Sequence, residues 1–309
     1  MFFRGSSVVK LVDVGPRDGL QIVGPFVPTE QKIALVRRLH AAGVASIEIG
    51  SFVAAAAVPQ LADVREVMAG ALALPGLDAR VLVATERRGL QAVAAGARHL
   101  VFVLSVSEKH NASNVGRTPL QSIAEAQRLL ERIPQDVRVR LDVSTAFDCP
   151  FDGPVAPEQT LALIERLAGA RDGMEIALCD TTGRVTPDRV HGLFVRCIED
   201  FPQVTRWAFH GHDTYGMGVS NAIAAWQAGV SILDASIGGL GGCPFAPGAT
   251  GNVATEDLVW LFDRLGVATN VNADALLAIA HDVAALPGAC PGGRVRIASQ
   301  AARLAVFAS

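Results

Sequence analysis

The chain has 309 residues, of which 50% are apolar and 18% are charged, so it can bury a large core without disulfides. This composition excludes intrinsic disorder. The 27 Lys and Arg residues against 30 Asp and Glu residues give a net charge of −3. Because no run of like charges is present, binding to a nucleic-acid backbone or to an anionic bilayer is not expected.

The cysteines and the N-terminus indicate the compartment. Five cysteines, an odd number, are widely spaced and form no CxxC pair, which favours a reducing environment. The first ten residues lack the apolar core of a signal peptide. The charge-free stretch 214–233 is interrupted by Gly, Asn and Gln, so it is a poor membrane span. We therefore expect a cytoplasmic protein.

Eight short segments, rich in β-branched residues and bounded by Gly, Pro or Asp, are predicted to be strands. They lie at 11–15, 46–50, 80–85, 99–106, 138–145, 175–181, 207–213 and 232–239. Helical patterns alternate with them, and four of these patterns open at a threonine: Thr29, Thr118, Thr186 and Thr255.

Strict alternation of strands and helices requires parallel pairing, and eight such units close a barrel. The fold class is therefore predicted to be α/β, a (β/α)8 TIM barrel with additional C-terminal helices. We expect residues 1–270 to form the catalytic barrel and residues 271–309 to form a helical appendage that begins near Asn272.

Active sites of such barrels lie at the carboxyl ends of the strands, so polar residues late in a strand are candidates for function. Arg17 and Asp18 follow the first predicted strand, Glu48 lies in the second and Asp180 ends the sixth. The fixed charge of Arg17 could neutralise an oxyanion. Glu48 and Asp180 could move protons or orient ligands, and the sequence leaves both roles open.

His210 and His212 are the strongest signal from spacing alone. Residues two apart on a strand face the same side, so the two imidazoles can reach one ion. The alternative is a pair of histidines in the core or on the surface. With Asp18 across the barrel mouth and the amide oxygen of Asn252, they form a mixed N/O set that suits Mg²⁺ or Mn²⁺, with other divalent ions not excluded.

The segment 238–252, which contains Cys243, has six glycines and two prolines. This composition is typical of a loop that moves over an active site, where a thiol could exchange a proton. The alternative for Cys243 is a small buried hydrophobic residue. Asp13 and Asp142 lie within predicted strands and are interpreted as buried, hydrogen-bonded acids that support their neighbours.

Four motifs stand out in the sequence: VDVGPRDGLQ (12–21), SIEIGSFV (46–53), HGHDTYGMGVSNA (210–222) and GGLGGCPFAPGATGNVATEDLV (238–259). Together they resemble the 3-hydroxy-3-methylglutaryl-CoA lyase family of barrel metallolyases. The resemblance extends from about Val9 to Val271. It implies an acyl-CoA substrate and a divalent cation, Mg²⁺ or Mn²⁺. We also expect a homo-oligomer, a dimer or a tetramer.

The resemblance also implies roles for the candidate residues. Arg17 would stabilise an enolate, Cys243 would be the acid/base of a mobile loop, and Glu48 and Asp180 match further active-site acids. The cation ligands would be Asp18, His210, His212 and Asn252. The implied reaction is a retro-Claisen cleavage of 3-hydroxy-3-methylglutaryl-CoA, or a close 3-hydroxyacyl-CoA, to acetyl-CoA and a keto acid such as acetoacetate.

Two loops depart from the family pattern. Residues 22–25 (Ile-Val-Gly-Pro) stand where the family has an Asn-Glu-Lys-like segment, and Ala54 to Ala57 replace a Ser-Pro-Lys segment. Both loops have lost polar groups, which predicts a more apolar pocket and a bulkier or less polar acyl group.

Other functions remain open at this stage. A related lyase could act on citramalyl-CoA or on an isoprenoid-derived hydroxyglutaryl-CoA, and a Claisen-condensing enzyme would use the same site. A Schiff-base aldolase is disfavoured because none of the three lysines, Lys10, Lys32 and Lys109, is predicted to lie in a barrel strand. The remaining alternative is a non-catalytic barrel that binds ligands.

Overall fold

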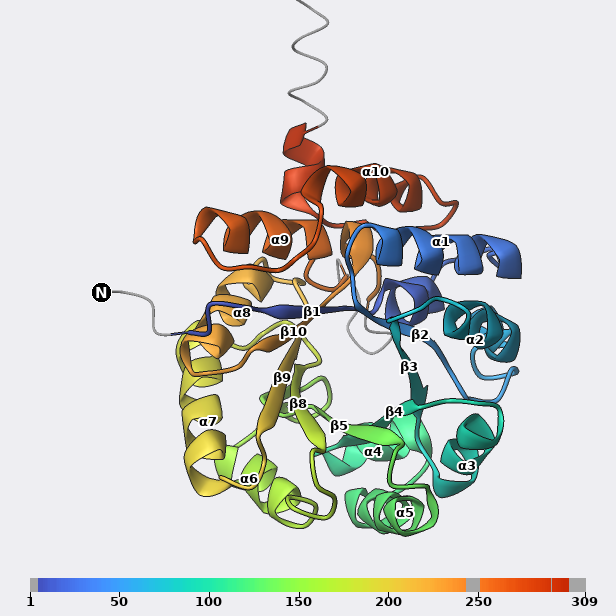
Figure 1. Cartoon of the computed structure of the whole chain (residues 1–309). Helices are drawn as coiled ribbons and strands as arrows, with labels where there is room; N and C mark the ends of the chain where they lie inside the picture. Colours follow the sequence, from blue (N-terminus) through green and yellow to red (C-terminus); the bar gives the residue numbers. More distant parts are fainter. Residues whose placement is uncertain (1–4, 243–250, 290, 300–309) are drawn as a thin grey trace, which may run out of the picture.

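The computed structural model describes residues 5–242, 251–289 and 291–299. Eight parallel strands close into a barrel, in the order β1-β10-β9-β8-β5-β4-β3-β2, and helices surround them (Figure 1). The prediction of a (β/α)8 barrel is confirmed. The barrel strands are β1 (Lys10–Asp13), β2 (Ser46–Ser51), β3 (Asp78–Val83), β4 (His99–Ser105), β5 (Arg138–Ser144), β8 (Glu175–Asp180), β9 (Arg206–Gly211) and β10 (Ile232–Ala235).

The helices begin where local sequence signals place them. Thr118 accepts a hydrogen bond from the Gln121 amide while the Gln121 side chain bonds back to the Thr118 amide, and Pro119 occupies the first helical turn. The four helix starts predicted at threonines are confirmed. The helices outside the barrel are α1 (Thr29–Ala41), α2 (Val64–Leu72), α3 (Glu86–Ala94), α5 (Pro119–Arg132), α6 (Pro157–Glu165), α7 (Pro187–Asp200), α8 (Gly218–Gln227), α9 (Thr255–Arg264) and α10 (Ala273–Ala284).

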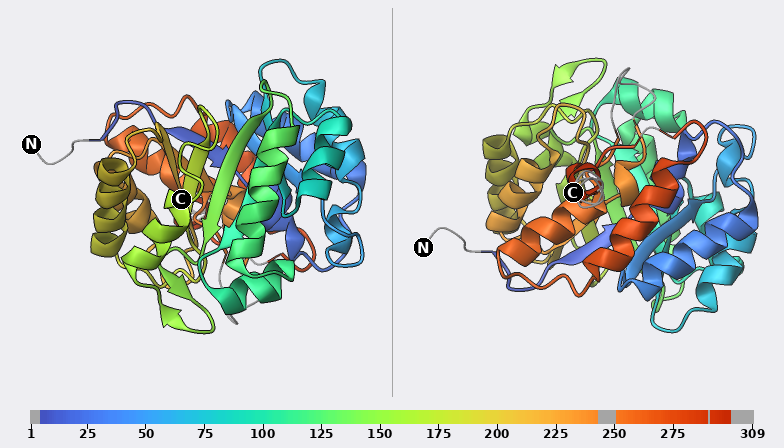
Figure 2. Two further views of the ribbon diagram at one scale, coloured as in Figure 1. Left: turned by 90° about the horizontal axis from the view of Figure 1, so that it is seen from below. Right: turned by 90° about the horizontal axis from the view of Figure 1, so that it is seen from above.

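Additional short elements lie in the loops between strands and helices. The helix α4 (Glu108–Val115) and the hairpin of β6 (Asp148–Cys149) and β7 (Gly153–Pro154) project at one end of the barrel (Figure 2). A five-residue π-helix, η1 (Gly15–Gly19), follows β1. Two short 3₁₀ helices, η2 (Pro59–Leu61) and η3 (Ile237–Gly239), follow β2 and β10. The first and eighth strands were predicted too long, because the chain leaves the barrel to form η1 and η3.

The helix α10 packs against α1, α9 and η3 on the outside of the barrel. The Asn272 side chain accepts a hydrogen bond from the Ala275 amide, so the helix predicted from Asn272 onward is confirmed. The domain boundary after residue 270 stays a prediction. Within the part of the chain that is described, no helix has the length and apolar character needed to cross a bilayer.

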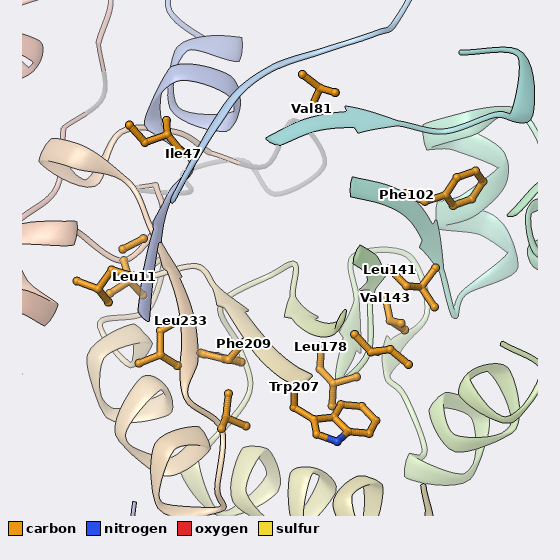
Figure 3. Close-up of a cluster of buried hydrophobic side chains, with 14 of the residues drawn as sticks. Leu11, Ile47, Val81, Phe102, Leu141, Val143, Leu178, Trp207, Phe209 and Leu233 are labelled. Atoms are coloured by element: carbon orange, nitrogen blue, oxygen red, sulfur yellow. The ribbon is translucent and has the colours of Figure 1, made fainter. Parts of the chain in front are cut away.

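The strands alternate between two buried faces. Side chains such as Phe102 and Leu233 lie on the face toward the helices and form the main hydrophobic core (Figure 3). Inside the barrel, a second cluster of mostly small apolar side chains contains Val12, Ala177 and Ala208. Bulky aliphatic layers are usual inside such barrels, so the small residues leave room for other side chains.

Charged groups fill that room. Arg80 and Arg140 are fully buried, and both guanidinium groups contact Glu175, at 2.6 Å and 3.3 Å. Asp78 extends the network, because it accepts hydrogen bonds from Arg80 and from the ring of His99. Asp78, His99 and Glu175 are the first residues of β3, β4 and β8. A layer of paired ions, the ionic layer, therefore lies at the amino ends of the strands.

Lys10 corrects one expectation. It is the first residue of β1, although no lysine was predicted in a barrel strand, and its Nζ donates to Asp78 Oδ2 at 2.8 Å. The ammonium group therefore lies at the amino end of the barrel, because Asp78 is the first residue of β3. Lys10 is thus placed in the ionic layer and not at the carboxyl end of the barrel.

The ionic layer predicts how stability depends on pH. Burial opposes ionisation of Glu175, but Arg80 and Arg140 outweigh it and lower its pKa to about 2 from the ordinary value of 4.5. Its contribution to the free energy of unfolding is thus present above pH 4.5 and is lost as the pH falls toward 2. Denaturant titrations of wild type and Glu175→Gln should differ by about 3 kcal/mol near pH 7, and the difference should shrink below pH 4.5. A difference that is constant from pH 7 to pH 3 would contradict this account.

Candidate metal and active site

The turn after β1 carries Arg17 and Asp18. Asp13, at the end of β1, accepts hydrogen bonds from the Gly15 amide at 2.8 Å and from Thr255 Oγ1 at 2.7 Å, and so it anchors the start of η1. This confirms the interpretation of Asp13 as a buried supporting acid. Arg17 Nη1 then donates to Asp18 Oδ1 at 2.5 Å, within the same turn.

Glu48 lies directly behind Arg17. Its side chain is 1% exposed on β2 and accepts a hydrogen bond from Arg17 Nε. The guanidinium group of Arg17 is therefore held between two carboxylates, those of Asp18 and Glu48. Its remaining surface contributes to the cavity wall, because Arg17 lines the cavity at the barrel mouth whereas Glu48 does not.

His210 lies in β9, His212 follows the last residue of that strand, and both face Asp18. The ligand atoms of Asp18, His210 and His212 all lie within 4.8 Å of one another. His212 Nδ1 donates to the Asp180 carbonyl at 3.0 Å, and His210 Nδ1 donates to Asp234 Oδ2 at 3.1 Å, because both partner oxygens accept only. Both Nδ1 atoms are thus engaged, and His212 Nε2 lies 3.7 Å from Asp18 Oδ2. The rings stand edge to face, with centroids 5.2 Å apart.

Asn252 completes the group. Its backbone forms an isolated antiparallel β-bridge with that of His212. Its side-chain Nδ2 donates to Asp18 Oδ2 at 2.8 Å and to the Leu240 carbonyl at 3.1 Å. The neighbouring Gly241 has a φ of +119°, and a Cβ there would lie 2.4 Å from Asn252 Nδ2. Only glycine therefore allows this approach of the backbone to the amide.

These residues fit a divalent cation. Among the described residues, His212 Nε2 and Asn252 Oδ1 are buried and have no hydrogen-bond partner. Burial opposes ionisation of Asp18, but Arg17 and the two histidines outweigh it and hold the pKa of Asp18 well below its usual range. An anionic oxygen, an amide oxygen and two imidazole nitrogens form a donor set that suits a divalent cation.

The cavity beside this group has a volume of about 210 Å³. Arg17, Asp18, His210 and His212 contribute to its polar lining. Apolar side chains form much of the rest, from the loop after β2, from strands β3 and β4 and from helix α4: Val53, Ala57, Val58, Leu82, Ala84, Val103 and Val115. A larger groove of about 600 Å³ runs between α4, α5 and α6 and contains none of the predicted site residues.

Only one of the two unusual loops reaches the cavity. Ala57 lines it together with Val53 and Val58, so the replaced segment after β2 does form an apolar wall. Residues 22–25 do not line it. Instead, the Gln60 side chain donates to the Val23 and Pro25 carbonyls, which holds that loop against η2.

Asp180 is buried and does not line the cavity. Its Oδ1 accepts a hydrogen bond from the Gly183 amide, its Oδ2 is buried without a partner among the described residues, and burial raises its pKa to about 6. Neighbouring Cys179 and Thr181 line the cavity, whereas Asp180 does not. Its backbone carbonyl orients His212. Cys243 lies outside the described residues.

Several site residues were not singled out from the sequence. Asp234 contacts His210, and Ser51, His110 and Asn114 line the cavity. The sequence did contain a signal for Asp234, which is the single acidic residue of the otherwise apolar strand ILDA. Such a buried acid needs a partner, and here the partner is His210 on the neighbouring strand. His110 and Asn114 lie on α4, an extra helix in a loop, and no periodic pattern pointed to them. Asp142 also lines the cavity, and it accepts a hydrogen bond from Arg140 as a buried supporting acid.

Comparisons with known proteins agree with this geometry. The HMGL-like family model matches residues 8–283. The (R)-citramalyl-CoA lyase of Chloroflexus aurantiacus is 42% identical over 294 residues, which cover 91% of this chain and 92% of that protein. The mitochondrial hydroxymethylglutaryl-CoA lyase of Mus musculus is 40% identical, over 87% of this chain and 82% of that protein. The chain belongs to the HMGL-like family.

Solved structures of this family have the same fold. An HMG-CoA lyase from Acinetobacter baumannii, in complex with coenzyme A and 3-methylmalate, superposes with a TM-score of 0.88 at 35% identity, and 94% of each chain is covered. An HMG-CoA lyase from Pseudomonas aeruginosa gives a TM-score of 0.90 at 36% identity, covering 96% of this chain and 99% of that one. The HMGL-like chain described here is therefore a lyase.

The site geometry predicts the effect of removing one ligand. In His212→Ala the buried Nε2 is lost, so we expect the affinity for Mn²⁺ to fall by at least about 100-fold, more than the loss of an outer hydrogen-bond partner causes. Mn²⁺ binding can be followed by the electron paramagnetic resonance signal of the free ion. His40→Ala is the control, because His40 lies on α1, away from the site, and contacts the Pro75 carbonyl. Unchanged affinity in folded His212→Ala would remove His212 from the ligand set.

Proposed function

We propose that this HMGL-like lyase is a divalent-metal-dependent enzyme that cleaves a carbon–carbon bond in a 3-hydroxyacyl-CoA. The proposed substrate is 3-hydroxy-3-methylglutaryl-CoA or a close analogue, and the products are acetyl-CoA and acetoacetate. The observation that carries the proposal is the convergence of Asp18, His210 and His212, within 4.8 Å, beside the guanidinium group of Arg17. Mg²⁺ or Mn²⁺ is the proposed cation, held by these three residues and Asn252.

Asp18, His210, His212 and Asn252 would hold the ion, and the other site residues would perform the chemistry. A bound divalent cation would act as a Lewis acid that lowers the pKa of the tertiary hydroxyl group of the substrate. Once a general base accepts the proton of that hydroxyl, the bond between C2 and C3 breaks. The oxygen becomes the carbonyl of the keto acid, and the bonding electrons move to the thioester as an enolate.

Arg17 is positioned to stabilise this negative charge. Its guanidinium group is fixed by Asp18 and Glu48 before the substrate arrives, so little reorganisation is needed during the reaction. We therefore assign Glu48 to orienting Arg17. Asp180, whose pKa is raised to about 6, remains the second proposed acid, since it can exchange a proton near neutral pH. Cys243 is proposed to protonate C2 of the enolate, which yields acetyl-CoA.

A second substrate is favoured by two observations. The relative that cleaves (R)-citramalyl-CoA, according to its name, is 42% identical, and the cavity wall from Val53 to Val58 is apolar. Both are compatible with an acyl group other than methylglutaryl, including an isoprenoid-derived hydroxyglutaryl group. Cleavage of citramalyl-CoA by the same steps gives acetyl-CoA and pyruvate, so the keto acid product separates the alternatives.

The test is a substrate panel with purified protein. We expect acetyl-CoA from 3-hydroxy-3-methylglutaryl-CoA in the presence of Mg²⁺ or Mn²⁺, and no product after chelation. Mass spectrometry of the keto acid identifies the cleaved substrate, and (R)-citramalyl-CoA and a hydroxyglutaryl-CoA with a longer apolar branch complete the panel. If chelation leaves turnover unchanged, or if no hydroxyacyl-CoA is cleaved, the proposal is wrong.

The proposed acid has its own test. Cys243→Ala should lower kcat by about 10²- to 10⁴-fold, the usual contribution of general acid–base catalysis, while circular dichroism and metal content stay unchanged. Cys197→Ala is the matched control, since Cys197 is buried in α7 against the hydrophobic core. Wild-type turnover in Cys243→Ala would exclude a role for this thiol in proton transfer.

A further inference from the structure

The interior of the barrel contains a chain of charged residues that reaches the candidate metal site. Glu175 contacts Arg140 at 3.3 Å, and the two Nη atoms of Arg140 donate to both oxygens of Asp234, at 2.8 Å and 2.5 Å. Asp234 Oδ2 in turn accepts a hydrogen bond from His210 Nδ1 at 3.1 Å. The chain of contacts thus links the ionic layer to one proposed ligand.

Strand register explains why Asp234 meets His210. In the β10–β9 pair, Ile232 lies opposite Ala208 and Leu233 lies opposite Phe209. Ile232 and Ala208 belong to the apolar cluster inside the barrel, so the next residues of the same parity, Asp234 and His210, also face the interior. Their contact follows from the pairing of two strands and not from a mobile loop.

Arg140 restricts the Asp234 carboxylate strongly. A bidentate contact fixes the plane of the carboxylate, and the side chains of Asp234 and Arg140 are 1% and 0% exposed. An oxygen held in this way defines where the Nδ1–H of His210 must point. The opposite atom, Nε2, is then the ring nitrogen available to a cation, in a group whose ligand atoms lie within 4.8 Å of one another.

The two histidines are oriented by different acceptors. His212 donates to a backbone carbonyl, that of Asp180, so no side-chain substitution can remove its partner. His210 donates to the side chain of Asp234. A substitution at Asp234 therefore changes the orientation of one ligand and leaves the partner of the other in place.

Stability alone does not explain this arrangement. Replacing buried ion pairs by apolar residues is often neutral or stabilising, so a buried network is weak evidence for a stabilising role. Glu175 provides the comparison, because it also pairs with Arg140 but makes no contact with either histidine among the described residues. A purely structural role would make the two carboxylates equivalent for metal binding.

We propose that Asp234, fixed by Arg140, is a positioning residue that holds His210 in the Nδ1-protonated tautomer and directs its Nε2 toward the cation. This inference rests on the proposed metal dependence of the lyase, but not on the identity of its substrate.

The experiment compares Asp234→Asn with Glu175→Gln in the full chain. Each variant removes one carboxylate charge from Arg140, and only the first one touches His210. We expect the Kd for Mn²⁺, measured from the resonance signal of the free ion, to rise by about 10- to 100-fold in Asp234→Asn. In Glu175→Gln it should stay close to the wild-type value. Equal Kd values in folded Asp234→Asn and in wild type, or equal losses in both variants, would overturn the proposal.

A second measurement does not depend on the folding of a variant. In the wild-type protein loaded with Mg²⁺, which is diamagnetic, ¹⁵N-edited histidine spectra should show His210 protonated at Nδ1, assigned by comparison with His210→Ala. A proton on Nε2 of His210 would overturn the proposal even if Asp234→Asn does not fold.

The outcomes also separate this inference from the proposed function. If wild type binds no Mn²⁺, both are wrong. If wild type binds Mn²⁺ and the Kd values follow the expected order, but no acyl-CoA is cleaved, the role of Asp234 stands and the proposed reaction is wrong.

Discussion

Closure of the barrel is the constraint on which the site depends. Asp18 follows β1, and the two histidines lie at and just after the carboxyl end of β9, nearly 200 residues later. Strand β10 lies between β1 and β9 because the sheet closes on itself. Their ligand atoms meet within 4.8 Å only for that reason. Asp18 stays ionised there, because Arg17 and the histidines offset the cost of burial. An anionic oxygen and two imidazole nitrogens that converge in this way suit a divalent cation.

The interior of the barrel supports this site by electrostatics more than by apolar packing. Small residues such as Ala177 and Ala208 leave space inside the sheet, and Arg80, Arg140 and Glu175 occupy the layer beneath. Buried charges are costly unless each is paired, and here each arginine is paired with at least one carboxylate. The ionic layer therefore supports the carboxyl ends of the strands, where the side chains of the site need fixed orientations.

Much of this could be predicted from the sequence, because the signals were local. Alternation of apolar strands with helices that open at threonines is decided by residues close together in the chain, and His210 and His212 share a face because they are two apart. The ends of β1 and β10 were predicted wrongly, since the chain turns there into η1 and η3, which lie far apart in the sequence and contact each other. Asp234 was not recognised because its partners, Arg140 and His210, are 94 and 24 residues away. Such pairings depend on strand register, which periodicity does not supply.

The most direct test of the central claim is the anomalous scattering of Mn²⁺ in crystals of this lyase grown with the ion. We expect one strong anomalous peak between Asp18, His210 and His212, with the Asn252 amide turned so that its oxygen faces the ion, at coordination distances near 2 Å. If crystals with excess Mn²⁺ show no peak there, or if the three side chains point away from one another, the metal site and the chemistry built on it would be contradicted.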